Sequence, residues 1–194
     1  MPNRVIESDD AVALATRWFL EGRPVDMRAL ADAMAVGRAT LYRVVGSQER
    51  LLGDVMIGLA TEIMTASFDR ARARGLAPGV DLIVGAARHL NTAIVRARPL
   101  RTFLAREPDL AFRVLFMPAA RVHLRNVAAW QAVLQEAVDS GELELKVEPE
   151  RLAYMFVRIG ESMIYADLLA DREPDLELAA DLQRHLLMTS PPGG

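Results

Sequence analysis

The segment from Leu30 to Leu52 constrains this chain more than any other part of its sequence. Its apolar spacing predicts a short helix that ends near Met34, and the next helix is expected over residues 38–44. The three residues between them, 35–37, leave room only for a tight turn. A third helix is expected to start at once, so the segment reads as a helix-turn-helix.

The second of these short helices is predicted to be amphipathic. Leu41, Val44 and Val45 stand at i, i+3 and i+4, so they share one face that can be buried. At about 100° per residue, Ala39 and Arg43 point away from that face. A recognition helix has this arrangement, because one side holds it to its domain and the other enters a major groove about 12 Å wide. The pattern therefore predicts contact with double-stranded DNA.

Composition limits the other classes of function. The chain has 194 residues, of which 52% are hydrophobic, enough for a substantial core. It has no cysteine and three scattered histidines, so we expect no disulfide, no metal site and no cofactor. The N-terminus lacks the apolar core of a signal peptide, and no uncharged apolar run approaches the ~18 residues of a membrane span. These features predict a soluble cytoplasmic protein.

Charge gives weak support to DNA binding. The net charge is −3, and residues 1–58 hold seven arginines against eight acids. Across residues 36–50, however, three arginines face the single acid Glu49, so the predicted contact surface is positive. Neutralisation of phosphates supplies much of the affinity for DNA. We therefore expect modest affinity, or affinity that depends on a dimer.

The rest of the chain reads as helical, with glycine and proline as punctuation, and predicts an all-α fold of about nine helices. Ser8 or Asp9, Asp26 and Ser47 are candidate N-caps of the first, second and fourth helices. An alternating stretch, 143–147, is expected to be an extended linker rather than a strand, because no partner strand is visible. The remaining helical segments are predicted at 80–97, 100–106, 109–116, 119–139, 150–170 and 175–188.

The helix expected over residues 150–170 indicates a second copy of the chain. Its stretch 152–157 is apolar without interruption, and a helix that is apolar all round must be enclosed. One small domain offers few neighbours for its penultimate helix. We therefore expect this helix and the last one to form a four-helix bundle with their copies in a homodimer.

Several residues of the helix-turn-helix resemble the TetR family of transcriptional regulators, namely Leu30-Ala31, Val36, Thr40-Leu41-Tyr42, Ser47, Glu49 and Leu51-Leu52. The resemblance covers the first ~50 residues and the all-helical plan. It implies a three-helix DNA-binding domain at residues 1–53 and a helical ligand-binding and dimerisation domain at 54–190.

The resemblance also implies roles for individual residues. Thr40 and Tyr42 would contact phosphates, while Arg38, Ala39 and Arg43 would lie nearest the base edges. The chain departs from the family pattern at five places: Ala35 replaces the turn glycine, Gly37 the capping serine, Val45 a later aromatic residue, and Gln48 a lysine that contacts phosphate, with Arg50 as its candidate substitute. The fifth departure is the loop 22–25, which is about two residues short. The candidate DNA-binding residues are Arg38, Ala39, Thr40, Tyr42, Arg43, Gln48 and Arg50.

Two stretches of the C-terminal half, 103–111 and 157–167, are similar to the QsdR-like branch of the family. The name of that branch refers to the degradation of quorum-sensing lactones. The resemblance therefore implies a lactone-like effector.

Candidate ligand-binding residues form a polar stripe and an aromatic set. Arg158, Glu161, Ser162 and Tyr165 follow one side of a helix and could hold the polar head of a ligand. The aromatic residues could line its apolar part, and they are Phe103, Phe112, Phe116, Trp130 and Tyr154. Two plainer interpretations stay open, since the arginine and the glutamate could form a structural ion pair and the aromatic residues could be core.

A second, smaller set of polar residues lies on the helix expected at 80–97. His89 and Asn91 could line the same pocket or be satisfied residues of the core.

The sequence thus predicts a ligand-responsive regulator, a repressor released from a palindromic operator by a small apolar or lactone-like effector. The alternative is a helical ligand-binding or adaptor protein without specific DNA binding. An enzyme with Glu161 or His123 as base is not expected, because no nucleophile, base and orienting residue form a pattern.

Overall fold

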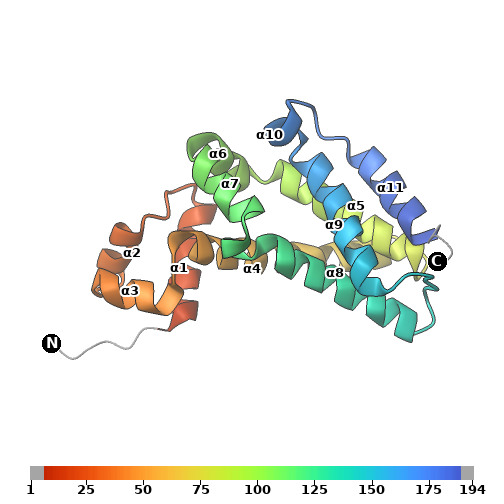
Figure 1. The fold of residues 1–194 in the computed structure, drawn as a ribbon, viewed down its shortest axis with the longest axis horizontal. Coiled ribbons are helices and arrows are strands. Elements are labelled where there is room, and N and C mark those ends of the chain that lie inside the picture. The colour runs from red at the N-terminus through yellow and green to blue at the C-terminus, as the bar shows by residue number, and fades with distance from the viewer. Residues whose placement is uncertain (1–6, 189–194) are drawn as a thin grey trace. The chain divides into compact units, whose positions relative to one another are not determined.

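The computed structural model describes residues 7–188, and this part of the chain is helical without a strand (Figure 1). The all-α prediction is confirmed. Eleven α-helices and one short 3-10 helix are present in this range: α1 (Ser8–Leu20), α2 (Met27–Ala33), α3 (Arg38–Val45), α4 (Gln48–Ala73), α5 (Val80–Arg96), α6 (Arg98–Arg106), α7 (Pro108–Phe116), η1 (Pro118–Ala120), α8 (Val122–Asp139), α9 (Pro149–Ile164), α10 (Ala166–Ala170) and α11 (Leu176–Met188).

The described residues form eleven α-helices rather than the expected nine, because the two short segments expected at 100–106 and 109–116 are separate helices, α6 and α7, and because the helix expected over residues 150–170 is divided. The helix expected from residue 119 begins instead at Val122, since residues 118–120 form the 3-10 turn and Arg121 takes the left-handed conformation, with φ of +59°. The helix expected over residues 150–170 ends at Ile164, and α10 follows after Tyr165. The interruption at Tyr165 has no glycine or proline, so the sequence carries no signal for it.

Three of the expected helix starts can be compared with the structure. Asp26 caps α2 by accepting a hydrogen bond from the Ala29 backbone N–H at 2.8 Å, and Ser47 caps α4 by accepting one from Arg50 N at 3.1 Å. The cap of α1 is Glu7 rather than Ser8 or Asp9, and it forms a capping box with Asp10. A carboxylate one residue before the expected serine therefore caps the start of the helix.

The chain divides into two compact units that do not follow the sequence in a simple order. Unit 1 comprises the residues up to Leu59 together with Ala97–Leu124, and unit 2 comprises Ala60–Arg96 together with the residues from Arg125 on. The long helix α4 begins in unit 1 and ends in unit 2, so the expected domain boundary at residues 53 and 54 lies inside a continuous helix.

Unit 1 holds the three N-terminal helices, the first part of α4, and helices α6 and α7. Its fully buried residues include Leu30, Leu41 and Leu51, one from each of the helices α2, α3 and α4. The glycine at position 53 permits a close approach, because a Cβ there would lie 2.3 Å from the carbonyl oxygen of Ala120. Burial of these leucines holds the short helices of the helix-turn-helix in place, since helices of seven or eight residues are not stable alone.

Unit 2 is a helical bundle in which α11 packs against both α5 and α9 (Figure 1). Its core includes a stack of rings from three helices: Phe68 lies 6.1 Å from Trp130, and Trp130 lies 4.7 Å from Phe156, between ring centroids. The expected linker over residues 143–147 is not helical, and Leu143 is buried in the same core. Helix α5 contributes one apolar face to this core, with Ile83, Val84, Ala87 and Leu90 buried.

Helix α4 is both long, with 26 residues, and apolar. Its most apolar 18-residue window has a mean hydropathy of 1.4, so by length and composition α4 could cross a membrane. In the structure 39% of that window is buried. Core helices of soluble proteins meet the same criterion, so the feature is weak evidence for a membrane span.

Candidate functional site

Helix α3 presents the two faces that its sequence predicts. Leu41 is fully buried and Val45 is 3% exposed, which anchors the helix to unit 1. Arg38, Ala39 and Arg43 are exposed, and the Tyr42 side chain is 46% exposed. Arginine guanidinium groups can bind base edges or phosphates, and a tyrosine hydroxyl can donate to phosphate. The other predicted contact on α3, Thr40, is half-buried.

The turn between α2 and α3 places an alanine in the left-handed region. Ala35 has φ of +56°, a conformation that glycine adopts freely and that a Cβ makes unfavourable by about 1–2 kcal/mol. Gly37, two residues later, is the N-cap of α3 and makes no side-chain hydrogen bond. Buried Leu30 and Leu41 on either side of the turn fix its geometry despite this strain.

The start of α4 carries the last two residues predicted to contact DNA, and they differ in their surroundings. Gln48 is half-buried, and its Nε2 donates to the carbonyl oxygen of Val25 at 2.8 Å. Arg50 is exposed. The amide of Gln48 therefore holds the loop before α2 to the start of α4, whereas the guanidinium of Arg50 faces solvent.

Glu49, between them, is held within unit 1. Its carboxylate accepts a hydrogen bond from Nε of Arg113 on α7 at 3.2 Å. The pKa of Glu49 is lowered, chiefly by a backbone hydrogen bond, then by the hydroxyl of Ser47 and by Arg113, while partial burial opposes these effects. The negative charge of this acid, which lies between Gln48 and Arg50 in the sequence, is therefore balanced by Arg113 within the protein and is not directed at phosphates.

Helices α6 and α7 pack on the N-terminal helices, which the sequence did not predict. Phe103 meets Phe19 of α1 edge to face at 5.9 Å between ring centroids. Nη1 of Arg106 donates to the carbonyl oxygen of Gly22 at 2.6 Å. No local pattern signals these contacts, because 84 residues separate the arginine from the glycine.

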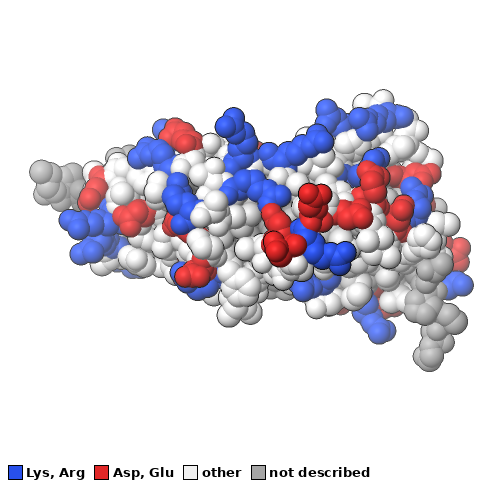
Figure 2. All heavy atoms as spheres, turned by 90° about the horizontal axis from the view of Figure 1, so that it is seen from above, with Lys and Arg blue, Asp and Glu red and all other residues white. Residues whose placement is uncertain are grey.

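This packing changes the charge of the candidate DNA-binding part. Residues 97–124 contain five arginines and two acids, so unit 1 as a whole has twelve arginines against ten acids, while unit 2 has eleven basic residues against sixteen acids. Figure 2 shows basic and acidic side chains interspersed on one face of the molecule. The acidic excess of the whole chain therefore belongs to unit 2.

The structure does not gather the predicted ligand-binding residues into one unit. Phe103, Phe112 and Phe116 belong to unit 1, whereas the remaining six belong to unit 2: Trp130, Tyr154, Arg158, Glu161, Ser162 and Tyr165. Phe103 is buried against α1, and Phe112 is exposed, with its ring 5.3 Å from that of Phe116. Trp130 lies in the core of unit 2, and Tyr154 is half-exposed.

The polar stripe on α9 contains an ion pair. Nη1 of Arg158 donates to Oε2 of Glu161 at 3.0 Å, and the glutamate side chain is 9% exposed against 45% for the arginine. The hydroxyl of Ser162 donates to the carbonyl oxygen of Arg158 at 2.7 Å. Tyr165 lies after the last residue of α9. These contacts fit the structural interpretation of the stripe.

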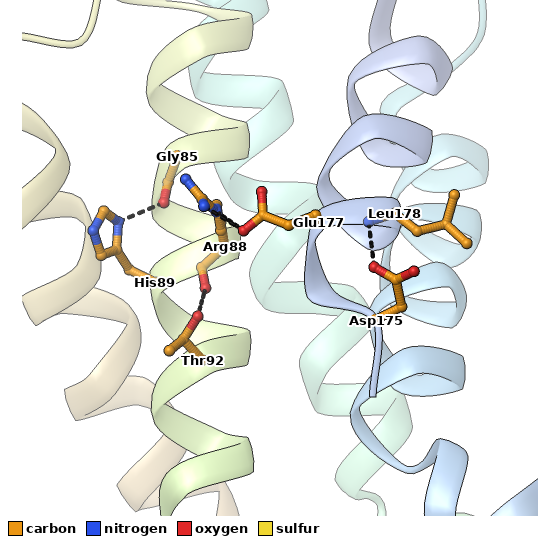
Figure 3. A network of polar contacts seen from close by, with 7 residues as sticks. All are labelled: Gly85, Arg88, His89, Thr92, Asp175, Glu177 and Leu178. Carbon is orange, nitrogen blue, oxygen red and sulfur yellow. Dashed lines mark hydrogen bonds and ion pairs between the residues drawn. The ribbon is translucent and has the colours of Figure 1, made fainter. Parts of the chain in front are cut away.

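The polar residues of α5 point in different directions. Figure 3 shows Arg88 directed at Glu177 of α11, with which it forms an ion pair, and His89 on the opposite side of α5, where its Nδ1 lies 2.7 Å from the carbonyl oxygen of Gly85. Asn91 is buried beside Gly160, and its Nδ2 has no hydrogen-bond partner among the described residues. His89 and Asn91 thus occupy different surroundings.

Comparisons with known proteins agree with this fold. Residues 78–188 match the family described as tetracyclin repressor-like, C-terminal domain. A solved structure of a transcriptional repressor, QsdR from the TetR family of R. erythropolis, is similar over 96% of this chain and 97% of its own, with 28% identity and a TM-score of 0.86. No curated protein gave a match.

The anchored, exposed helix α3 after a tight turn gives this all-helical chain the geometry of a helix-turn-helix regulator. The chain belongs to the TetR family. Regulators of this family are in general cytoplasmic, non-enzymatic proteins that bind DNA and small-molecule effectors as dimers. The family match and the similar solved structure confirm the family and the fold that the sequence predicts.

Proposed function

We propose that this chain is a repressor that binds a palindromic operator as a homodimer and is released from it by a small apolar effector. The observation that carries the proposal is the exposed face of α3. Arg38, Ala39, Tyr42 and Arg43 lie on it together, opposite fully buried Leu41. A basic face on an anchored helix is suited to a major groove.

Within this proposal the residues divide by role. Arg38, Ala39 and Arg43 read base edges, and Thr40, Tyr42 and Arg50 contact phosphates. Gln48, the remaining candidate, acts through the loop that it holds at Val25. Two recognition helices in one dimer would read half-sites about 34–36 Å apart, which is one turn of DNA.

A second copy of the chain would cover apolar side chains that the single chain leaves exposed. On α9, α10 and α11 these residues are 36–67% exposed, and they are Tyr154, Met155, Leu168, Leu169, Leu178, Leu182 and Met188. Leu178 and Leu182 are one turn apart on α11, so they share a face. Clusters of exposed apolar residues of this kind mark interaction surfaces. We propose α9 and α11 as the centre of the dimer interface.

The effector would act by preferring a conformation with the wrong separation of the recognition helices. A shift of occupancy from 1:99 to 99:1 requires about 5.5 kcal/mol of differential binding. Helix α4 runs through both units and is the element that can transmit the change. The resemblance to the QsdR-like branch favours a lactone-like molecule. A cytoplasmic location would follow from such a role.

Binding to DNA tests the proposal against the adaptor alternative. Fluorescence anisotropy with labelled fragments flanking the protein's own gene should show saturable binding that survives competition by unrelated DNA. The double variant Arg38→Ala/Arg43→Ala should lose this binding. Its matched control, Arg17→Ala/Arg98→Ala, removes two exposed arginines of unit 1 that lie on α1 and α6, and it should bind nearly as well as the wild type.

Two results would reject the proposal. One is equal affinity for flanking and unrelated DNA. The other is an equal loss in both double variants, which would indicate a general effect of charge and not a recognition surface. Either result would favour a ligand-binding protein without specific DNA binding.

A further inference from the structure

Unit 2 contains a cleft that the sequence did not indicate. It has a volume of about 520 Å³ and lies between the second half of α4, the start of α5 and the end of α8. Its floor is apolar and buried, formed by Leu82, Ile83 and Ala137. Phe68 and Val133 form half-buried walls. A volume of this size is that of a typical small-molecule site.

One end of the cleft is preformed by close backbone contact. Gly79 has φ of +84°, and a Cβ at this position would lie 2.3 Å from the carbonyl oxygen of Glu142. The turn before α5 and the turn after α8 therefore meet backbone to backbone. Leu76 packs directly over Gly85, where a Cβ would lie 2.2 Å from its Cδ1. These contacts fix the end wall without a ligand.

The rim of the cleft carries two carboxylates and one guanidinium. Glu136 and Glu142 are exposed, and neither side chain has a hydrogen-bond or ion-pair partner among the described residues. Arg72 already has partners, since its guanidinium lies 3.5 Å from Asp69 and stacks 5.6 Å from the centre of the Phe68 ring. The charges left for a ligand are therefore negative.

The charge of unit 2 acts in the same direction. Its sixteen acids against eleven basic residues give a potential that attracts cations to a cleft in its surface. An apolar floor beneath a negative rim matches a molecule with an apolar body and a positive head.

We propose that this cleft binds an amphipathic organic cation, with its apolar part on Ile83 and its charged head at Glu136 and Glu142. This cation belongs to a different chemical class from the apolar effector proposed above, and only a regulatory role of the cleft rests on the proposed function. As a binding site, it can be tested without DNA. None of the residues that the sequence singled out for the ligand lines the cleft, but one of them, Trp130, contacts its Phe68 wall.

A tryptophan next to the cleft reports its occupation. Phe68 lines the cleft and lies 6.1 Å from Trp130, which is buried behind it. The other tryptophan of the chain, Trp18, is in unit 1. A Trp18→Phe background therefore leaves Trp130 as the source of tryptophan fluorescence.

Three probes with apolar parts of similar size separate the ligand classes. Decyltrimethylammonium is a cation, decanoate is an anion, and a ten-carbon γ-lactone is uncharged. Each is titrated below its micellar concentration and followed by Trp130 fluorescence and calorimetry. We expect saturable binding of the cation, weaker at high salt, and little binding of decanoate. Equal binding of decanoate, or no saturable binding of the cation, would overturn the proposal. Tighter binding of the lactone would overturn the cation class and favour the lactone-like effector.

Substitutions at the rim locate the site. Glu136→Gln/Glu142→Gln should weaken binding of the cation about three- to tenfold, as expected for two solvent-exposed charge pairs. The matched control Glu62→Gln/Glu144→Gln removes two exposed acids of unit 2 that do not line the cleft. It should change the affinity less than twofold. Equal weakening by both double variants would reject the cleft as the site.

A variant that fills the cleft gives a second, independent readout. Thr65 is exposed at the rim, so Thr65→Phe adds bulk without disturbing the core. This variant should abolish the Trp130 response to the cation, and an unchanged response would contradict the proposal. Operator binding is measured on the same ligand-free protein. If operator binding is absent and the cation binds, the proposed function is wrong and the cleft is still a cation site. If the operator binds and the cation does not, the cleft proposal is wrong and the proposed function is unaffected.

Discussion

The carboxylate of Glu49, in the first turn of α4, lies 3.2 Å from Nε of Arg113 on α7. This ion pair joins residues that are 64 positions apart and ties the helix after the recognition helix to a later segment of unit 1. Together with the contact of Arg106 to Gly22, it makes the part that carries the recognition helix larger than the N-terminal 53 residues.

The first prediction concerns the pH dependence of stability through Glu49. Because the folded-state pKa of Glu49 is lowered, its ionised form stabilises the folded protein. That contribution is complete above the ordinary pKa of 4.5 and is lost as the pH falls through the folded-state pKa. Glu49→Gln should therefore lower the free energy of unfolding by up to about 1 kcal/mol at neutral pH. The difference from the wild type should vanish in acid.

Urea unfolding at a series of pH values measures this effect. Glu62→Gln, which removes an exposed acid of the same helix, is the control. A difference for Glu49→Gln that persists below the folded-state pKa, or the same curve for the control, would show that the ion pair and its hydrogen bonds are not the cause.

The second prediction separates Gln48 from Arg50. Gln48→Ala removes the hydrogen bond to the carbonyl oxygen of Val25 and should lower the free energy of unfolding by about 0.5–1.5 kcal/mol. Arg50→Ala should leave stability unchanged and weaken DNA binding at all sequences alike, with a smaller salt dependence. Thermal unfolding and anisotropy on the same two proteins check both statements. If Arg50→Ala lowered the stability and Gln48→Ala did not, the structural role would belong to Arg50 and not to Gln48.

The third prediction concerns the strained turn. Ala35→Gly removes the Cβ from a residue at φ of +56° and should stabilise the protein, since the relieved strain exceeds the added entropy of the unfolded chain. A net gain of about 0.5–1 kcal/mol corresponds to a rise in Tm of about 1–4 °C. Ala13→Gly, in the exposed middle of α1, should lower the Tm instead. A lower Tm for Ala35→Gly would mean that the turn is not strained.

The fourth prediction distinguishes base readout from phosphate contact on α3. Arg43→Ala should lose about 1–3 kcal/mol of discrimination at one operator position. Tyr42→Phe, which removes only the hydroxyl, should weaken binding to every operator variant about equally. Competition with a library of single-base operator variants measures both. A position-selective loss in Tyr42→Phe would assign base readout to the tyrosine.

The fifth prediction concerns the dimer. Leu178→Glu/Leu182→Glu places charges on an exposed apolar face of α11 and should give a folded monomer that has lost operator binding. Leu20→Glu, at an exposed leucine of α1, should leave the oligomeric state unchanged. Sedimentation and circular dichroism measure mass and fold. A double variant that stays a dimer would place the interface elsewhere.

Phe156 belongs to the core of its own chain. The apolar run 152–157 of α9 does not reveal which of its side chains are buried within one chain and which are left for a second copy. Phe156 is fully buried against Trp130 within one chain, whereas Tyr154 and Met155 are half-exposed. A charge at Phe156 would therefore disrupt the fold of unit 2 itself and would say nothing of a dimer. Within one chain, α9 buries four residues of this apolar run, Leu152, Ala153, Phe156 and Val157, so fewer of them remain for a second copy than the run predicted.

The amino-acid sequence by itself determined the features that depend on near neighbours in the chain. The spacing of Leu41, Val44 and Val45 set the inward side of α3, where Leu41 and Val45 are buried and Val44 is half-buried. Asp26 and Ser47 marked where helices begin. These are interactions over three or four residues, so their pattern can be read directly. The family resemblance rested on the same short segment.

Only the tertiary structure decided which distant segments share a unit. It placed Phe103 against Phe19, paired Arg113 with Glu49, and formed the cleft from α4, α5 and α8. Such contacts depend on how amphipathic helices cross. Many crossings bury similar apolar areas, so the pattern along one helix does not specify its partner. Local spacing therefore determined the exposed face of α3, while long-range packing determined what supports that helix and where the cleft of unit 2 lies.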